Sequence, residues 1–538
     1  MIADITITIS PDKEKDEHFI RQEISRELTS KGIKTKADTS VMTYILSKKS
    51  VDARRRMVKL VLRYKVYIGE KPEDSQNSVP QWKHADGTKK VIIIGSGPAG
   101  LFGAFTLLEH GIQPIIIERG SATGQRRKDI AAISIKGTVD KDSNYCFGEG
   151  GAGTFSDGKL YTRSNKRGDI SSILRIFAHF GADKKILTDA HPHIGTDKLP
   201  AIINAMNTKL TELGAELYFD TRCTDFITDV ACSTASIPVK GVKTKNTKTG
   251  EEKEFMADAV LLATGHSATD IYEMIARIAP AALEAKTFAV GVRVEHSRNI
   301  IDEIQYHGKR GEHLGAAEYR LTSQQNGRGV YSFCMCPGGF VVPSATGPEE
   351  IVVNGMSAAG RNSQWSNAAF VVETRPEDIP AEFTSPITPA LNGLVWRTYI
   401  ERNTFKCGNG QQAPAQRMQD FIEEKISETL PKTSYTPGIV SRDLRECLPP
   451  QITERLASAF NYFNRSMKGF LCPEALLIAS ETRTSTPVRI LRNKDTGECT
   501  AIRNLYPAGE GSGYAGGIVS SAMDGVNECK MIISNLGL

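Results

Sequence analysis

The sequence predicts an α/β protein whose main domain holds a parallel sheet with helices on its faces. Strand and helix patterns alternate from residue 89 to about residue 270, which is typical of parallel sheets. A strand, a glycine-rich turn and a helix begin this region at Lys90, and a further strand and helix follow within residues 504–526. We therefore expect one domain that is split in sequence, with another segment inserted between its two parts.

The composition supports a globular protein of several domains. The chain has 538 residues, of which 40% are hydrophobic and 24% charged. This length gives an expectation of about three domains and excludes a disordered, fibrous or small disulfide-stapled protein. The formal net charge of +5 is too small to indicate a nucleic-acid or membrane partner for the whole chain.

The N-terminus and the cysteines indicate a cytosolic protein. The start, MIADITITIS, lacks the basic and apolar regions of a signal peptide, and no later apolar run reaches the roughly 18 residues that span a bilayer. We expect a cytoplasmic protein with no membrane contact. The ten cysteines include no Cys-x-x-Cys pair, which favours reduced thiols over a disulfide framework or a zinc site.

Residues 1–70 are expected to form a small α+β module. ITITI alternates as a strand does, helical spacing follows, and a long strand places Leu60, Leu62 and Val66 on one face. The pattern is β-α-β and resembles a small ferredoxin-like unit. Residues 48–65 contain eight basic residues and one acidic residue. A solvated outer sheet face is the favoured explanation, and an RNA or other anionic partner is the alternative. A polar linker, residues 71–88, follows.

The first motif after the linker is a dinucleotide fingerprint. KKVIIIGSGPAGLFGAF contains an apolar strand, then G-x-G-x-x-G, then a helix that opens with Pro98 and Ala99. The first glycine, Gly95, permits a tight turn; Gly97 lets the backbone approach a pyrophosphate; Gly100 lets the helix pack close to the strand. The phosphates are then expected at the helix N-terminus, where free N–H groups and the positive dipole end meet.

A second strand ends at Glu118, eighteen residues after Gly100, and Arg119 follows it. The Glu118 carboxylate is placed to accept hydrogen bonds from the adenosine ribose hydroxyls and would repel a 2′-phosphate. Strand, helix, second strand and acid occur in the expected order, so this segment predicts dinucleotide binding. It leaves open whether the dinucleotide is FAD or NAD.

Two later motifs resemble those of the glutathione-reductase-type FAD superfamily. One is FMADAVLLATGH, an apolar strand that ends near Thr264 and Gly265; the other is YPAGEGSGYAGGI. The resemblance implies FAD, with Gly509 and Glu510 beside the ribityl chain. It also implies that the loop ending at Gly516, Gly517 and Ile518 places a helix N-terminus against the pyrimidine edge of the flavin.

Further segments resemble the family of FAD-dependent proteins labelled NAD(FAD)-utilising dehydrogenases. They are CFGEGGAGTFSDGKLYTR, PHIGTDKL, FAVGVRVEH, YSFCMCPGGFVVPSA and ETRTSTPVRI, and with the motifs above they span nearly the whole chain. The resemblance implies one FAD domain with an inserted substrate domain. It also implies that backbone near Cys223 contacts the adenine. The loop at Gly150 and Gly151, with Ser156, is glycine-rich enough for the backbone to approach the flavin or pyrophosphate.

NAD(P)H-disulfide reductases carry a second G-x-G-x-x-G motif for the nicotinamide cofactor and a redox cysteine pair beside the flavin, and neither is found in this sequence. We therefore expect either that NAD(P)H binds only transiently at the flavin as the electron donor or that another molecule is the reductant. Candidate catalytic residues are Lys159, Glu481 and Arg483, although an ion pair explains the last two equally well. For Cys334 and Cys336, simple packing of two thiols is favoured over redox chemistry. No metal site is expected.

The predicted function is an FAD-dependent oxidoreductase that transfers hydride or electrons between bound FAD and an unidentified small substrate. The alternatives are an RNA-associated flavoprotein and a non-catalytic flavin-binding sensor. The substrate and the oligomeric state are left open. The predicted fold is a Rossmann-type FAD-binding domain, split in sequence, with an inserted α+β substrate or cap domain and a ferredoxin-like N-terminal module. The predicted divisions are 1–70 (module), 71–88 (linker), 89–274 (first FAD part), 275–480 (inserted domain) and 481–538 (second FAD part).

Overall fold

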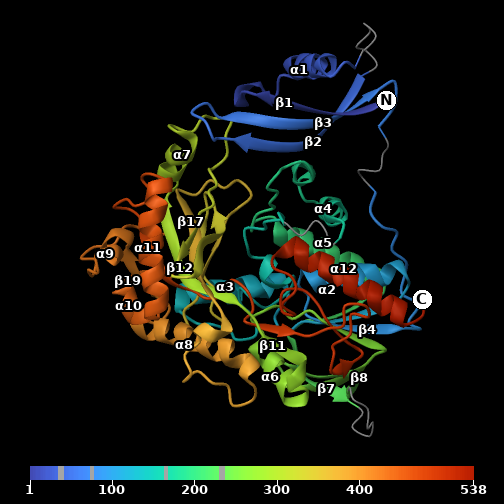
Figure 1. Ribbon diagram of the computed structural model, residues 1–538. Helices are drawn as coiled ribbons and strands as arrows, with labels where there is room; N and C mark the ends of the chain where they lie inside the picture. The colour runs from blue at the N-terminus through green and yellow to red at the C-terminus, as the bar shows by residue number, and fades with distance from the viewer. Residues whose placement is uncertain (34–41, 73–77, 163–167, 229–236) are drawn as a thin grey trace.

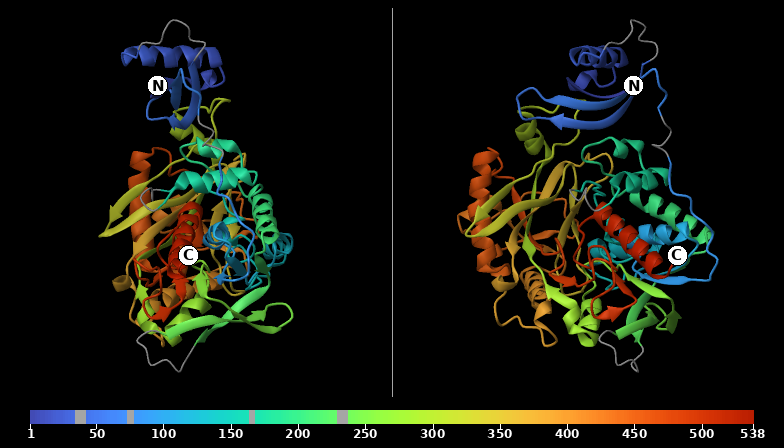
Figure 2. Two further views of the ribbon diagram at one scale, coloured as in Figure 1. Left: turned by 90° about the vertical axis from the view of Figure 1, so that its right-hand side faces the viewer. Right: turned by 45° about the vertical axis from the view of Figure 1, so that its right-hand side comes forward.

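The structure is a computed structural model that describes the 538-residue chain except residues 34–41, 73–77, 163–167 and 229–236. Figure 1 shows a small N-terminal module above two larger bodies that lie side by side. One body is built on a parallel sheet and the other on a mixed sheet. The rotated views in Figure 2 show the module as a separate unit that sits on top of these bodies.

The N-terminal module is a three-stranded antiparallel sheet, in the order β1-β3-β2, with one helix on one face. The predicted alternation in the long strand is confirmed, because Leu60 and Leu62 are buried whereas Lys59 and Arg63 are exposed. Arg63 pairs with Asp4 across the outer face. An RNA partner at this face stays a prediction. The elements are β1 (Ile2–Ile9), α1 (Glu17–Ser30), β2 (Met42–Asp52) and β3 (Lys59–Ile68).

Strand β2 was not predicted. Its pairing with β3 shifts register between Leu46 and Lys48, and such an irregularity breaks the period-two pattern that reveals a strand in sequence. The module is therefore β-α-β-β rather than β-α-β. Strand β2 also attaches the module to the main body, since the Lys49 N–H donates to the Thr188 carbonyl at 2.7 Å and the Ala190 N–H to the Lys49 carbonyl at 2.8 Å.

The predicted parallel sheet is present, with five strands in the order β23-β10-β4-β5-β6, each parallel to its neighbours. The last strand in sequence, β23, joins the edge beside β10, so the C-terminal segment completes a sheet begun four hundred residues earlier. The strands are β4 (Lys90–Ile94), β5 (Gln113–Ile117), β6 (Glu216–Tyr218), β10 (Ala259–Leu262) and β23 (Leu505–Pro507).

Both faces of the parallel sheet are covered, as buried parallel strands require. Helices pack on one face in a single apolar core, with α2 against α12. A small, mostly antiparallel sheet and one helix pack on the other face. The first group is α2 (Pro98–Glu109), α4 (Ile170–His179), α5 (Leu199–Glu212) and α12 (Ile518–Asn535). The second is β7 (Thr221–Thr228), β8 (Ile237–Asn246), β9 (Glu252–Met256), β22 (Ile502–Arg503) and α6 (Thr269–Ile278).

Residues between 288 and 481 build a seven-stranded mixed sheet in the order β13-β14-β17-β12-β20-β18-β19. Helices cover its outer face, and their core includes alternate residues of β12, such as Val292 and Val294. The strands are β12 (Phe288–Ser297), β13 (Thr322–Gln325), β14 (Arg328–Cys336), β17 (Trp365–Thr374), β18 (Ala413–Arg417), β19 (Ile439–Ser441) and β20 (Leu476–Glu481). The helices are α7 (Arg298–Tyr306), α8 (Asn392–Cys407), α9 (Met418–Ile422), α10 (Leu444–Cys447) and α11 (Pro450–Ser466).

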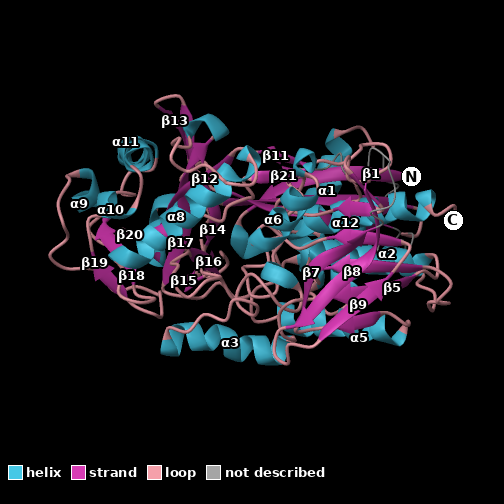
Figure 3. Cartoon of the chain, turned by 90° about the horizontal axis from the view of Figure 1, so that it is seen from below, coloured by secondary structure: helices cyan, strands magenta, loops and turns pink. Residues whose placement is uncertain are grey.

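Shorter elements connect the two sheets (Figure 3). Strand β11 pairs with β21, and β15 forms a hairpin with β16. These elements are α3 (Thr123–Lys136), β11 (Leu283–Ala285), β15 (Phe340–Pro343), β16 (Val353–Met356) and β21 (Val488–Ile490). Among the helices in the described ranges, none has the length and apolar character needed to cross a membrane.

Candidate functional site

A pocket lies where the parallel sheet, the glycine-rich loops and the seven-stranded sheet meet. Residues from three glycine-rich segments, 95–103, 148–158 and 509–517, line it, although the first and the last are about 400 residues apart in the sequence. The predicted residues in its lining are Gly95, Gly97, Pro98, Ala99, Glu118, Arg119, Gly151, Ser156, Lys159, Cys223, Thr264, Gly265, Glu481, Arg483, Gly509, Glu510, Gly517 and Ile518. Gly100, Gly150 and Gly516 lie behind or beside this lining.

The turn between β4 and α2 has the predicted geometry. Gly95 has a φ of +104°, which side chains rarely adopt, and a Cβ at Gly100 would collide with the Gly95 carbonyl. These two glycines therefore permit the turn and the close helix packing, as expected. Gly97 is the N-cap of α2 and offers no side-chain hydrogen bond. The first-turn N–H groups of α2 thus stay available for an anion in the pocket.

Glu118 is buried and holds loops together. Its two carboxylate oxygens accept four hydrogen bonds, from the N–H and hydroxyl of Ser96 (3.0 and 2.9 Å) and from the N–H groups of Gly120 (3.0 Å) and Gly148 (2.9 Å). A carboxylate offers about four acceptor sites. The predicted contact with ribose hydroxyls would have to replace or share one of these bonds, and it stays a prediction.

The glycine loop after Gly148 crosses the pocket between two helix N-termini. A Cβ at Gly151 would stand 2.9 Å from the Gly97 Cα, and a Cβ at Gly153 would stand 3.3 Å from the Ile518 side chain. The loop is anchored to the turn after β4, because the Gly150 N–H donates to the Ser96 hydroxyl at 3.2 Å. The close backbone approaches explain why this segment is rich in glycine.

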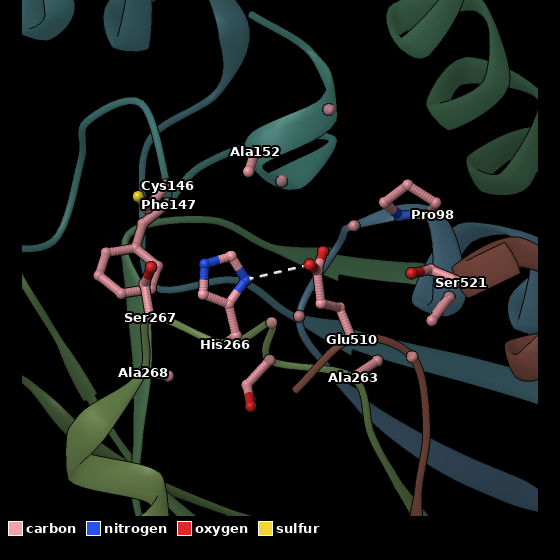
Figure 4. A pocket seen from close by; sticks show the side chains of 18 of the residues that line it. Pro98, Cys146, Phe147, Ala152, Ala263, His266, Ser267, Ala268, Glu510 and Ser521 are labelled. Carbon is pink, nitrogen blue, oxygen red and sulfur yellow. Dashed lines mark ion pairs between the residues drawn. The ribbon is translucent and has the colours of Figure 1, made fainter. Parts of the chain in front are cut away.

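The C-terminal segment brings a second uncapped helix N-terminus to the pocket. Gly517, with a φ of +97°, is the N-cap of α12 and makes no side-chain cap bond. Glu510 lies nearby and faces His266, whose Nδ1 is 3.6 Å from the Glu510 Oε1 (Figure 4). The other ring nitrogen of His266 is buried without a partner, as is the Ser267 hydroxyl.

His266 was not singled out from the sequence. It directly follows the predicted Gly265 in ATGH, and a polar residue after a strand end of a parallel sheet is the signal that could have found it. In Figure 4 its ring stands between Phe147 and Glu510.

Arg119 and Cys223 lie on the side of the pocket near β5 and β7. Arg119 donates to Asp142 and Asp270 at 2.8 and 2.9 Å, and its guanidinium lies over the Phe147 ring at 4.3 Å. The charge of Arg119 is therefore already neutralised by the protein. Cys223 is buried, and burial raises the pKa of its thiol to about 12, so it is an uncharged part of the wall. The predicted adenine contact of this segment stays a prediction.

Two of the three catalytic candidates lie in buried ion pairs, each with a partner from a distant segment and not with each other. Glu481 accepts from Arg293 at 2.9 and 3.0 Å. Arg483 donates to Glu401 at 2.7 and 3.0 Å and to Glu350 at 3.1 Å. Burial alone would lower the pKa of Arg483, but Glu401 raises it above its ordinary value. Both residues also line the pocket, so their catalytic role stays a prediction.

Lys159 is the third candidate, and its ammonium donates to Asp157 at 3.0 Å. Asp157 is buried and also accepts from Arg361 at 3.0 Å. The side chain of Lys159 is 31% exposed and lines the pocket. It is therefore a cation whose position is fixed by a buried carboxylate.

Where the structure describes the chain, no cluster of three or more His, Cys, Asp or Glu side chains is arranged to hold a metal ion. His191 is bonded to Glu318 at 2.8 Å, and His193 to the Ala359 carbonyl at 3.2 Å.

These features fit FAD. Two uncapped helix N-termini suit the pyrophosphate and an electron-rich ring edge. A crevice lined by glycine backbone lies between them, and two buried polar atoms, on His266 and Ser267, lack protein partners. Buried polar atoms normally have partners, so a ligand with several donors and acceptors matches the lining.

Comparison with protein families points to the same cofactor. Residues 88–140 match the FAD binding domain model, and residues 287–484 match a model described as FAD-dependent protein, C-terminal domain-like. Residues 1–67 match a domain of unknown function. A protein of Clostridium beijerinckii, described as uncharacterized, is 36% identical over 537 residues, which cover 96% of each chain. The chain belongs to the same family as this protein, and it contains the FAD binding domain and the FAD-dependent C-terminal domain named above. The narrower predicted label, NAD(FAD)-utilising dehydrogenase, is not part of these descriptions.

The solved structures with similar segments are distant. A geranylgeranyl bacteriochlorophyll reductase-like protein from Thermoplasma acidophilum is 10% identical, with 83% of this chain and 80% of that chain covered and a TM-score of 0.34. Glycine oxidase from Bacillus cereus is 13% identical, with 83% and 96% covered and a TM-score of 0.31. Glycerol-3-phosphate dehydrogenase from Bacillus halodurans, complexed with FAD, is 11% identical, with 54% and 49% covered and a TM-score of 0.29. Such low TM-scores establish no shared substrate.

Proposed function

We propose that the protein is an FAD-dependent oxidoreductase whose substrate enters between the bound cofactor and the seven-stranded sheet. The observation that carries the proposal is the composition of the pocket. Backbone from three glycine-rich segments lines the part that suits FAD, whereas Lys159, Glu481 and Arg483 line the same pocket from elsewhere. A cofactor site and a set of fixed charges therefore share one cavity, as a redox enzyme requires.

FAD, when bound, supplies two-electron chemistry. The protein's own residues hold and orient it: the N-terminus of α2 with Gly97 for the pyrophosphate, and Glu510 for the ribityl hydroxyls. The N-terminus of α12 favours negative charge at the edge of the flavin by about 0.3–1 kcal/mol, and up to ~2 kcal/mol when partly buried. For a two-electron couple this corresponds to a potential roughly 5–45 mV higher. This is tuning and not a source of catalysis.

The charged side chains that line or surround the pocket have a different role. Arg293 with Glu481, and Arg483 with Glu401, are paired before any substrate arrives, so they keep fixed dipoles around the cavity and limit water. Lys159 retains a proton, because Asp157 raises its pKa against the opposing effect of burial. It is therefore suited to bind and orient an anionic or electron-rich group on the substrate.

The test begins with the purified full chain. Protein that is yellow, or that takes up added FAD and retains it through desalting, supports the proposal; colourless protein that binds no added FAD would overturn it. NADH or NADPH is proposed as the electron donor. Anaerobic mixing with each should bleach the flavin absorbance, and air should restore it. If neither nucleotide reduces the flavin, this choice of donor is refuted. If the bound flavin cannot be reduced and reoxidised repeatedly with any tested pair of reductant and acceptor, the protein is a non-catalytic flavin-binding protein.

A further inference from the structure

Two thiols, Cys334 and Cys336, face one ammonium at the edge of the pocket. The Lys159 Nζ is 3.4 Å from the Cys336 Sγ and 3.7 Å from the Cys334 Sγ. Cys336 is buried, whereas Cys334 is partly exposed and lines the pocket. The favoured expectation was that the pair simply packs inside the sheet. Instead, both sulfur atoms lie against a cation, which apolar packing does not require.

The backbone at Cys334 is unusual in a way that serves this arrangement. Strand β14 pairs with β17 up to Phe333, and pairing resumes only at Cys336, with a shift of register. Within this bulge Cys334 has a φ of +45°, a left-handed conformation that costs a residue with a side chain of order 1 kcal/mol or more. Bulges often redirect a side chain beside a functional site. Here the bulge places two cysteines, only two residues apart, on the same ammonium.

The ammonium of Lys159 has three protons and three acceptors. Besides the two sulfurs it bonds Asp157 at 3.0 Å. Asp157 is held in turn by Arg361 and by the Ser357 hydroxyl. The lysine head group is therefore fixed at its far side by a carboxylate, and its remaining donors point to the thiols.

The charged groups around the pair include Lys159, Asp157, Arg293 and the Glu481 carboxylate that pairs with Arg293. A hydrogen bond from the Cys336 thiol, followed by the charges of Lys159 and Arg293, holds the pKa of Cys334 well below its ordinary value, against burial and the charge of Asp157. The Arg293 guanidinium also donates to the Cys334 carbonyl at 3.1 Å. Donating to Cys334 and burial raise the pKa of Cys336. Of the two thiols, the one with the lowered pKa is therefore Cys334, which lines the pocket, and the one with the raised pKa is the buried Cys336.

We propose that Cys334 and Cys336 form a redox-active dithiol that reduces a small-molecule disulfide bound in the pocket. The Cys334 thiolate attacks one sulfur of the substrate, the substrate S–S bond breaks, and the first leaving thiolate takes up a proton. Cys336 then loses its proton and its sulfur attacks Cys334, so that a Cys334–Cys336 bond forms and the second substrate thiolate leaves and is protonated. The substrate gains two electrons and two protons; the cysteine pair loses two electrons and the Cys336 proton, and the solvent supplies the second proton.

Return of the disulfide to one thiolate and one thiol requires two electrons and one proton. Two-electron-reduced FAD in the same pocket is the reductant, and in this respect the inference rests on the proposed function. The thiol chemistry itself does not depend on the cofactor, so the two ideas are separable by experiment.

The first experiment follows the cysteines directly. Trypsin releases residues 329–361 as one peptide, which contains Cys334 and Cys336 and no other cysteine. Treatment of the native full chain with glutathione disulfide should remove two hydrogen atoms from this peptide, as read by mass spectrometry after alkylation of the remaining thiols. In Cys336→Ser the peptide should instead carry a glutathione adduct on Cys334. Cys472→Ser, which removes a partly exposed thiol outside the pocket lining, should leave the wild-type result unchanged.

Lysine variants test the cause of the reactivity. Alkylation of wild-type Cys334 by iodoacetamide should reach half its maximal rate below the ordinary thiol pKa of about 8.5. Lys159→Met should move this midpoint upward, and Lys159→Arg should restore most of the difference. If Lys159 had only a structural role, the pH midpoint of Cys334 alkylation would not depend on the charge of residue 159.

Anaerobic titration with dithionite links the pair to the flavin. The oxidised wild type should take up about four electrons per chain, against about two in Cys334→Ser. A flavin-containing protein whose 329–361 peptide keeps both thiols after exposure to glutathione disulfide would overturn the inference and leave the proposed function standing. A protein that forms the disulfide but binds no FAD would refute the proposed function and, with it, the assigned reductant.

Discussion

Substitution of Gly97 by valine tests the placement of the dinucleotide with little direct effect on the fold. Gly97 has φ −72° and ψ −177°, an extended conformation open to any residue. A Cβ at this position meets only the Gly151 Cα, at the ordinary contact distance of 3.8 Å. Because Gly97 lines the pocket and no other atom lies within 4 Å of this Cβ, the two further methyl groups of valine extend into the crevice at the N-terminus of α2. We expect them to occupy the approach of the pyrophosphate.

The expected size follows from ligand linkage. FAD at about 100 times its dissociation constant stabilises the folded protein by about 2.7 kcal/mol, and Gly97→Val should lose this contribution. Without FAD the change should be small, because a poorer N-cap costs about 1 kcal/mol and the loss of glycine flexibility in the unfolded chain gains 0.4–1 kcal/mol. The assay is flavin retained after desalting, together with thermal unfolding measured with and without added FAD.

Two other glycine variants serve as controls. Gly97→Ala adds only the Cβ that the structure accommodates, so it should retain part of the FAD affinity. A Cβ at Gly95 would collide with the Ala263 carbonyl, at a φ of +104°, and Gly95→Ala should therefore lower stability even without FAD. A Gly97→Val protein that keeps full flavin occupancy would refute this placement of the pyrophosphate.

Three further predictions concern buried charges. Glu401→Gln leaves the bidentate partner of Arg483 neutral, and we expect the free energy of unfolding in urea to fall by about 3–5 kcal/mol; an unchanged value would contradict the importance of the pair. Burial lowers the pKa of His296 to about 4, against 6.5 when unfolded, so the unfolded state gains protons first and stability should drop by about 3 kcal/mol as pH falls from 6.5 to 4. His296→Gln should flatten this part of the pH profile, and an equally steep profile would refute the assignment. Burial raises the pKa of Glu528 from 4.5 to about 8 despite Arg492. The folded state therefore keeps this proton longer than the unfolded state, so its contribution to stability is complete below pH 4.5 and is lost as the pH rises toward 8. The free energy of unfolding of Glu528→Gln should change less over this pH range.

The parts of the fold that sequence predicts best are those fixed by local rules. The strand–turn–helix at Gly95 lies where the pattern placed it, because a tight turn, a helix start and close packing each demand a glycine at a set spacing. Strand β3 is likewise predicted by its alternation. Strand β2 was missed because its bulge interrupts the period.

The partners of the candidate side chains could not be predicted, since they come from distant segments. Glu481 was considered together with Arg483, but it pairs with Arg293, 188 residues away, and Arg483 pairs with Glu401. The C-x-C motif gave the two cysteines but not the bulge that turns Cys334 toward Lys159, because that bulge depends on how β14 pairs with β17. Spacing along a strand predicts a face only while the strand stays regular.

The division between backbone and side chain explains where substrate specificity must lie. The glycine-rich segments approach one another so closely that a Cβ at Gly151 would stand only 2.9 Å from the Gly97 Cα. This part of the pocket is therefore built largely from backbone, and backbone groups recognise only features that all dinucleotides share. Side chains with reactive or charged groups enter from β14 and β20 and from the end of the loop at Lys159. Changes on those elements can alter the substrate without disturbing the cofactor site. Variation of Cys334, Lys159 or Glu481 should therefore change what the protein reduces before it changes whether the protein holds FAD.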